Sequence, residues 1–120
     1  ILDSAMAVIE KHLDDADFNV NTFAREMAMA RTNLFTKLKG ITGQTPNEFI
    51  LTIRLKKGAY LLRNNPELNI TEISDRIGFS SPRYFAKCFK DVYHISPLAY
   101  RKETDAGNDT EGESEKEDET

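Results

Sequence analysis

The chain has 120 residues, of which 39% are hydrophobic, 16 basic and 20 acidic, with one cysteine and two histidines. This length allows one compact domain or two very small lobes that share a core. Its longest apolar runs, such as residues 49–53, are far shorter than the roughly 20 residues of a transmembrane helix. No signal-peptide pattern opens the chain and one cysteine cannot form an internal disulfide, so we expect a protein of the reducing cytoplasm.

The net charge of −4 averages two segments of opposite sign. Residues 103–120 carry nine acidic and one basic side chain, whereas residues 18–102 carry 14 basic and six acidic ones. The basic segment indicates a polyanionic partner. We expect the acidic tail to be disordered, because its one apolar residue, Ala106, buries too little surface to offset the entropy of ordering. This tail either keeps the protein solvated or competes with nucleic acid for the basic segment.

Helical periodicity runs through the body of the chain, and no alternating strand pattern is sustained. The chain starts inside the first amphipathic pattern without an initiator methionine, so we expect it to be part of a longer polypeptide. The patterns predict an all-α fold of seven helices, over residues 2–14, 20–28, 31–42, 46–63, 71–77, 81–93 and 96–102. Four of these helices begin with clear capping signals: Thr45 with Glu48, Asn69 with Glu72, Ser81 with Pro82, and Ser96 with Pro97.

An internal repeat divides the body into two halves. Residues 20–29 align with residues 70–79 at an offset of 50, and after the turn the offset is 51. Each half is a short helix, a tight turn and a longer helix, which is the helix-turn-helix pattern. Gly78 suits the left-handed conformation of that turn, whereas Ala28 at the equivalent position requires either strain or a differently shaped turn. Two such units in register favour DNA binding.

Each longer helix has a polar outer face on a helical wheel. The inner stripe is predicted to hold Leu34, Leu38 and Ile41 in the first helix, and Phe85, Phe89 and Val92 in the second. The outer faces carry Thr32, Asn33, Thr36 and Lys39 in the first, and Arg83, Tyr84, Lys87, Lys90 and Asp91 in the second. Such side chains can bond base edges or phosphates. Phe35 is interpreted as the edge of the core, with a contact to a thymine methyl group as the alternative.

Two further residues have structural interpretations. Cys88 borders the inner stripe and is expected to be a packed thiol rather than a nucleophile. Gly58 lies inside a strong helical pattern, which predicts a close approach of another helix. The histidines and the cysteine form no recognised catalytic or metal-binding motif, so we expect no enzymatic activity, metal or cofactor. The alternatives are an α-helical protein-interaction module that uses the same basic faces, and a hydrolase that uses Cys88.

Residues 18–101 resemble the DNA-binding domain of the AraC/XylS family of transcription regulators. The resemblance rests on residues 34–39 (Leu-Phe-Thr-Lys-Leu-Lys), 42–46 (Thr-Gly-Gln-Thr-Pro), 73–79 (Ile-Ser-Asp-Arg-Ile-Gly-Phe) and 95–101. It implies a sequence-specific DNA-binding domain over residues 1–102: lobe one over about 1–45, a linker helix over about 46–63 and lobe two over about 64–102. Residues 34–50 look most like members fused to two-component signalling modules, which implies a histidine-kinase or receiver portion upstream.

The resemblance also implies that two recognition helices enter successive major grooves and contact bases through their outer faces. Mapped onto this chain, the base contacts are Thr32, Phe35, Thr36, Arg83, Tyr84 and Lys87, and the phosphate contacts are Arg31, Asn33, Lys39, Ser81 and Lys90. The implied partners are double-stranded DNA, the upstream module and RNA polymerase, with a dimer for the full-length protein and a monomer for this chain alone. His94 stands where the family usually has glycine, so we expect a left-handed conformation there that costs stability.

Overall fold

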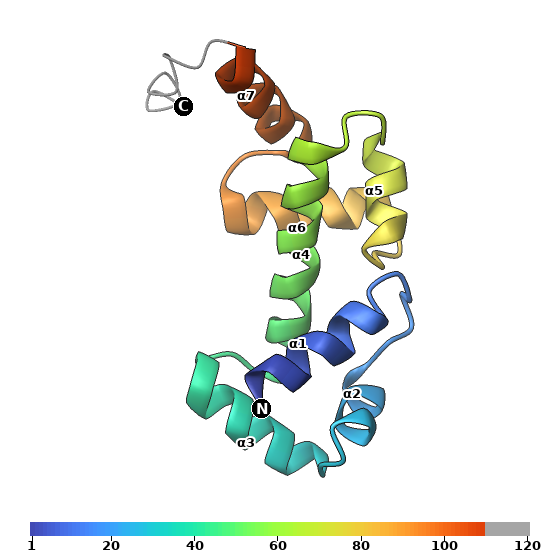
Figure 1. Ribbon diagram of the computed structural model, residues 1–120, viewed down its shortest axis with the longest axis vertical. Coiled ribbons are helices and arrows are strands. Elements are labelled where there is room, and N and C mark those ends of the chain that lie inside the picture. The colour runs from blue at the N-terminus through green and yellow to red at the C-terminus, as the bar shows by residue number, and fades with distance from the viewer. Residues whose placement is uncertain (110–120) are drawn as a thin grey trace.

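The computed structural model describes residues 1–109, with side chains through residue 103. Within that range the chain forms seven helices and no strand. In chain order these are α1 (Leu2–Lys11), α2 (Val20–Glu26), α3 (Arg31–Thr42), α4 (Pro46–Asn64), α5 (Ile70–Arg76), α6 (Pro82–Tyr93) and α7 (Pro97–Asp109). In Figure 1, α4 is the long axis that joins α1–α3 at its N-terminal end to α5–α7 at its C-terminal end. None of the helices in the described range is both long and apolar enough to cross a membrane.

The predicted all-α fold with two lobes is confirmed, with corrections at three helix ends. α2 ends at Glu26 rather than at residue 28, and apart from the ends of α1 and α7 the other bounds agree within one residue. α1 ends at Lys11 rather than at residue 14, because the chain turns there and directs the carbonyls of Leu13 and Asp15 toward the Arg54 side chain. α7 continues to Asp109 rather than ending at residue 102. The rest of the predicted acidic tail, residues 110–120, lies outside the described residues.

The four predicted capping signals operate as the sequence indicates. At α4 and α5 both capping boxes are closed: the Glu48 backbone N–H donates to Thr45 Oγ1 over 3.2 Å, and that of Glu72 to Asn69 Oδ1 over 2.7 Å. The serine caps of α6 and α7 accept backbone N–H groups over 3.1 Å each. The starts of these four helices are therefore determined locally.

Each lobe has its own hydrophobic core, and α4 contributes to both. The core of lobe one includes Ala5, Ile9, Phe18, Phe23, Ala24, Leu34, Leu38, Phe49, Ile50 and Ile53. The core of lobe two includes Leu55, Ala59, Leu61, Leu62, Leu68, Ile73, Ile77, Phe79, Phe85, Cys88 and Phe89. Because α4 faces lobe one with its first half and lobe two with its second, it is apolar around much of its circumference. Cys88 is 7% exposed and packs in the core of lobe two, as predicted.

Gly58 confirms the predicted close approach. A Cβ atom at this position would lie 3.0 Å from Ile77 Cδ1 and 3.1 Å from Phe85 Cε1. The missing side chain lets the centre of the second core reach the linker helix directly. This packing seats α6 on α4.

Three apolar side chains on the longer helices are more exposed than the wheel predicted. Ile41 and Val92, predicted to be inside, are each 52% exposed, and Phe35, interpreted as core edge, is 47% exposed. Ile41 and Val92 occupy equivalent positions in the last turn of α3 and α6. A helical wheel gives the direction in which a side chain points. It does not show that the last turns of α3 and α6 extend past the helices that would cover them. Phe35 is therefore available for contact with a partner.

His94 adopts the left-handed conformation predicted for it, with φ at 73° at the end of α6. A side chain with a Cβ atom is strained in this region, whereas glycine is not. We expect His94→Gly to raise the free energy of unfolding by about 1 kcal/mol, as measured by urea denaturation. The control Ala86→Gly, inside α6, should lower it by about 1 kcal/mol. A less stable His94→Gly variant would show that contacts of the imidazole outweigh the strain.

Candidate nucleic-acid interface

The turns that precede α3 and α6 have the same hydrogen bonds at equivalent positions. The backbone N–H of Met29 donates to Ala24 O, and that of Phe79 donates to Ser74 O, each over 3.0 Å. Ala24 and Ser74 are 3% and 0% exposed, so a small residue lies where the second helix of each unit crosses the first. Both units are therefore helix-turn-helix motifs with one geometry.

The two turns differ in strain. Ala28 has φ at 57° and Gly78 has φ at 79°, so both positions are left-handed. The sequence left open whether the turn at Ala28 is strained or differently shaped, and the structure has the strained left-handed form. Lobe one thus retains the helix-turn-helix geometry with an alanine where lobe two uses glycine.

The outer face of α3 is exposed over its whole length. The candidate base contacts Thr32, Phe35 and Thr36 and the candidate phosphate contacts Arg31, Asn33 and Lys39 are all exposed. Thr32, Phe35 and Arg31 line a hollow of about 480 Å³ together with Val20, Pro46 and Asn47. This hollow places an aromatic ring, a hydroxyl and a guanidinium on one concave surface, which suits a base edge beside its phosphate.

The outer face of α6 is strongly basic. Arg83, Tyr84, Lys87 and Lys90 are exposed, whereas Ser81 is half-buried and its hydroxyl caps the helix by accepting the Tyr84 backbone N–H. Lys87 Nζ lies 3.3 Å from Asp91 Oδ2, but the two side chains are 72% and 66% exposed. An ion pair this exposed is worth little. Lys87 can therefore exchange Asp91 for a phosphate or a base edge.

Tyr84 is held at its base and exposed at its tip. Its ring centroid lies 5.6 Å from that of Phe79, and 49% of the residue is exposed. Interaction with the Cys88 thiol, together with burial, raises the pKa of the Tyr84 hydroxyl above its ordinary value. A tyrosine hydroxyl is protonated at neutral pH at its ordinary pKa of about 10, and this shift keeps it so, so the phenol can donate a hydrogen bond.

Sequence reasoning missed Asn47, which lies between α3 and α6. A cleft of about 370 Å³ separates the lobes, and its lining includes Asn47, Ser80, Arg54, Gly78 and Tyr84. Asn47 also lines the hollow beside α3, so it lies between that hollow and the cleft. In the sequence Asn47 is an ordinary residue of a first helical turn, and no local pattern marks it.

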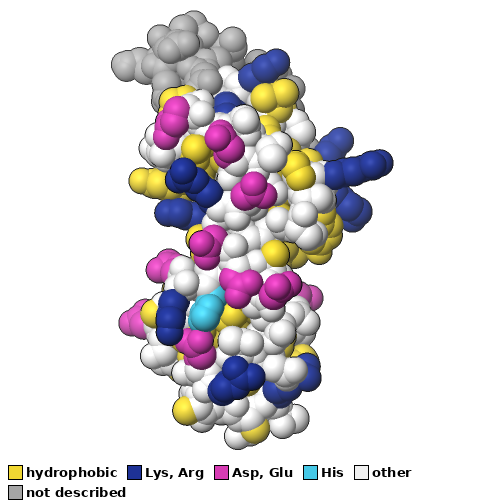
Figure 2. All heavy atoms as spheres, turned by 90° about the vertical axis from the view of Figure 1, so that its right-hand side faces the viewer, with side chains coloured by type: hydrophobic (Ala, Val, Ile, Leu, Met, Phe, Trp, Pro, Cys, Tyr) yellow, Lys and Arg dark blue, Asp and Glu magenta, His cyan; other side chains and the backbone are white. Residues whose placement is uncertain are grey.

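Charges are distributed unevenly on the surface. Figure 2 shows Lys and Arg side chains projecting from the edges of the upper lobe, which also carries some acidic side chains on this face, and a further group of acidic side chains around the narrow region between the lobes. The loop between α1 and α2 carries three exposed aspartates, Asp14, Asp15 and Asp17. A polyanion is therefore attracted to the recognition-helix side of lobe two and repelled by this loop.

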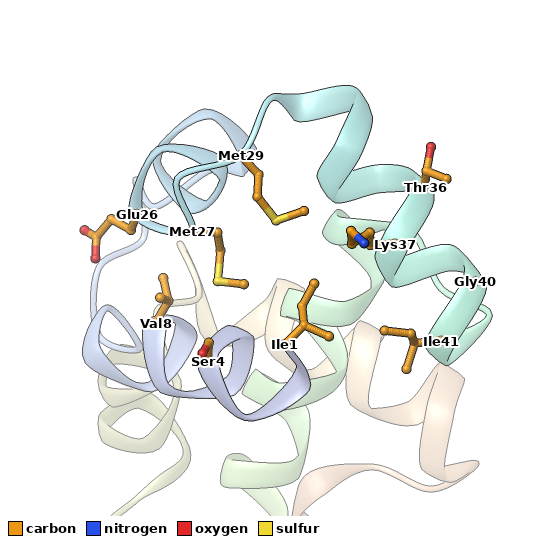
Figure 3. A pocket seen from close by; sticks show the side chains of 10 residues that line it. All are labelled: Ile1, Ser4, Val8, Glu26, Met27, Met29, Thr36, Lys37, Gly40 and Ile41. Carbon is orange, nitrogen blue, oxygen red and sulfur yellow. The ribbon is translucent and has the colours of Figure 1, made fainter.

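Lobe one has a second hollow, of about 640 Å³, between α1 and α3 (Figure 3). Its lining combines the apolar side chains of Val8, Met27, Met29 and Ile41 with the polar ones of Ser4, Glu26 and Lys37. Thr36 stands at its rim with its side chain directed away from these groups. The candidate base contact thus faces outward, and the hollow lies behind it.

A family model described as a helix-turn-helix domain matches residues 23–103. The chain belongs to the AraC-type helix-turn-helix family. This AraC-type domain is a DNA-binding domain of transcription regulators, and its fold is not a catalytic one. The resemblance found in the sequence is confirmed.

The similar proteins include signalling proteins and a DNA complex. Over 101 residues the chain is 43% identical to histidine kinase P4 of Formosa agariphila, a match that covers 84% of this chain and 7% of the kinase. The C-terminal domain of AraT, a response regulator from Geobacillus stearothermophilus, is 31% identical with a TM-score of 0.74, covering 82% of this chain and 80% of that one. The DNA-binding domain of AdpA, solved with a target DNA, is 29% identical with a TM-score of 0.76, covering 84% and 89%.

Proposed function

We propose that α3 and α6 enter successive major grooves on one side of a DNA duplex and read its sequence. The observation that carries this proposal is the pair of helix-turn-helix units, with matching turn hydrogen bonds, at the two ends of one continuous helix. α4 has 19 residues, so it is about 28 Å long at ~1.5 Å per residue. Lobes at its ends can span the ~34 Å between neighbouring major-groove windows.

The two recognition helices have different chemistry. In α3, Thr32, Phe35 and Thr36 meet the bases with hydroxyls and an aromatic ring, which suit base edges and thymine methyl groups. Their flanking phosphate contacts are Arg31, Asn33 and Lys39. The face of α3 is thus largely uncharged, and it contributes more to shape and methyl recognition than to electrostatic affinity.

α6 supplies positive charge and hydrogen-bond donors. Arg83 and Lys87 suit the acceptor groups of guanine, and Tyr84 donates from a fixed ring. Ser81 and Lys90 contact the phosphates on either side. Asn47, at the start of α4, faces the backbone between the two grooves. With these roles the chain divides into lobe one over residues 1–45, a linker helix over residues 46–63 and lobe two over residues 64–102.

The full-length protein is proposed to be a two-component regulator of the cytoplasm, with a histidine-kinase or receiver portion upstream of this domain. The similarity to a histidine kinase and to a response regulator supports this proposal. Dimerisation through the upstream portion would place two domains on paired sites and raise affinity by effective concentration. RNA polymerase is the further partner of such a regulator. The isolated domain is expected to be monomeric and to bind DNA weakly.

Selection from a randomised duplex pool tests this function. We expect enrichment of a site with two motifs about one helical turn apart. Fluorescence anisotropy on that site should show affinity that falls steeply with salt, because Lys and Arg contacts displace counterions. A scrambled duplex of equal length is the control. Equal affinity for both duplexes, or none at low salt, would contradict sequence readout and favour a protein-interaction module.

A further inference from the structure

Arg54 is a buried arginine whose hydrogen bonds reach both lobes. It lies in the middle of α4 and is 6% exposed. Its Nη1 donates to Leu13 O over 2.7 Å and to Ile77 O over 2.6 Å, and its Nη2 donates to Asp15 O over 3.0 Å. Leu13 and Asp15 belong to the loop between α1 and α2 of lobe one, and Ile77 begins the helix-turn-helix turn of lobe two.

The three carbonyls that Arg54 binds come from both lobes. Leu13 packs against both hydrophobic cores, so its loop is the place where lobe one reaches lobe two. Ile77 is the C-cap of α5, directly before the turn that aims α6. A single guanidinium therefore connects the body of lobe one to the turn that sets the direction of the second recognition helix. A planar fork with several donors suits this geometry, whereas the point charge of a lysine does not.

Gly78 completes this junction. A Cβ atom at position 78 would lie 1.5 Å from Arg54 Nη1 and 2.4 Å from Leu13 O. The guanidinium thus fills the space that any other side chain would need. This explains why lobe two has glycine in its turn, whereas lobe one keeps the left-handed turn with Ala28, whose side chain is exposed.

The lobes have room to move if the junction is released. The cleft of about 370 Å³ beside Arg54 lies between Phe18 of lobe one and Phe79 and Tyr84 of lobe two. Apart from Leu13, which packs against both cores, each lobe has its own buried cluster on α4. We propose that Arg54 is a positioning residue that fixes the angle between the lobes and thereby sets the spacing of the two DNA motifs that the domain accepts. This inference rests on the proposed two-groove binding.

Spacing selectivity tests the inference, because one inserted base pair moves the second motif by about 3.4 Å and rotates it by about 34°. The duplexes carry the selected site with the motif separation changed by −1, 0, +1 and +2 base pairs. Wild type should prefer one separation. Arg54→Lys keeps the charge, and we expect its preference for that separation over its neighbours to fall at least about fivefold.

Arg101 provides the matched control. It also makes three hydrogen bonds to carbonyls, those of Leu62, Leu68 and Asn65, but all three lie at the α4–α5 junction on the lobe-two side. Arg101→Lys should lose comparable stability and keep the wild-type spacing preference. A loss of preference in both variants would mean that general destabilisation is responsible, and an unchanged preference in Arg54→Lys would overturn the inference.

NMR residual dipolar couplings test the same angle without DNA. In wild type and Arg101→Lys, the amides of the two lobes should fit one alignment tensor. In Arg54→Lys they should require two tensors, and a single tensor there would contradict the inference. These spectra also show whether each variant is folded. If wild-type protein selects no DNA site, the proposed function fails while the couplings still decide whether Arg54 holds the lobes together.

Discussion

Gly78→Ala is expected to lower the free energy of unfolding by about 3 kcal/mol or more. Left-handed strain accounts for about 1–2 kcal/mol. The rest arises because the new Cβ atom would overlap Arg54 Nη1 and Leu13 O, at 1.5 and 2.4 Å. The carbonyl belongs to the backbone and cannot yield, and a displaced guanidinium would leave buried carbonyls without donors. Urea denaturation monitored by circular dichroism measures the loss.

Gly43→Ala is the control for this prediction. Gly43 has nearly the same φ, 78°, but nothing lies within 4 Å of the Cβ position. Its substitution by alanine should therefore show the backbone strain alone, about 1–2 kcal/mol. Equal losses in the two variants would show that the contact with Arg54 contributes nothing to stability.

Lys87→Ala should weaken binding to the selected duplex by about 1–3 kcal/mol, which is roughly five- to 150-fold. Its ammonium group is exposed on the outer face of α6, and its partner Asp91 is an exposed carboxylate that DNA can replace. Part of the loss should persist at moderate salt, because a base contact does not depend on counterion release alone. Fluorescence anisotropy across a salt series measures both the affinity and the slope.

Lys57→Ala removes the same charge from the linker helix. Lys57 Nζ lies 5.0 Å from the centre of the Tyr60 ring, and both residues line a hollow between α1 and α4. This variant should bind the selected duplex nearly as well as wild type and show the same preference over the scrambled duplex. If the two lysine variants lost affinity equally, net charge would explain binding and α6 would not be a recognition helix.

Much of the fold could be predicted because its signals are local. The capping pairs at Thr45 and Asn69 involve residues three apart in the chain, and both form hydrogen bonds as expected. The repeat placed two turns in register, and the left-handed conformation of Gly78 follows from it, whereas at Ala28 it left two turn shapes open. The left-handed conformation of His94 was expected from the glycine that the family usually has at that position. Signals of this kind depend on neighbours in sequence, which a single sequence displays.

Features that depend on distant parts of the chain could not be predicted. The wheel placed Ile41 and Val92 inside, but the exposure of each depends on how far the covering helices extend. Arg54 looks like a surface charge in sequence, yet it is buried because carbonyls from residues 13, 15 and 77 surround it. Asn47 is a candidate contact because it lines both the cleft between the lobes and the hollow beside α3, and both features depend on the fold.

Methylation interference on the selected duplex tests two-groove recognition most directly. Guanine N7 lies in the major groove, so a methyl group there blocks a recognition helix at that position. We predict two clusters of interfering guanines on one side of the DNA, about 10 base pairs apart, with the cluster assigned to α6 weakened in Lys87→Ala. A single cluster, or two clusters on opposite sides of the duplex, would contradict the account.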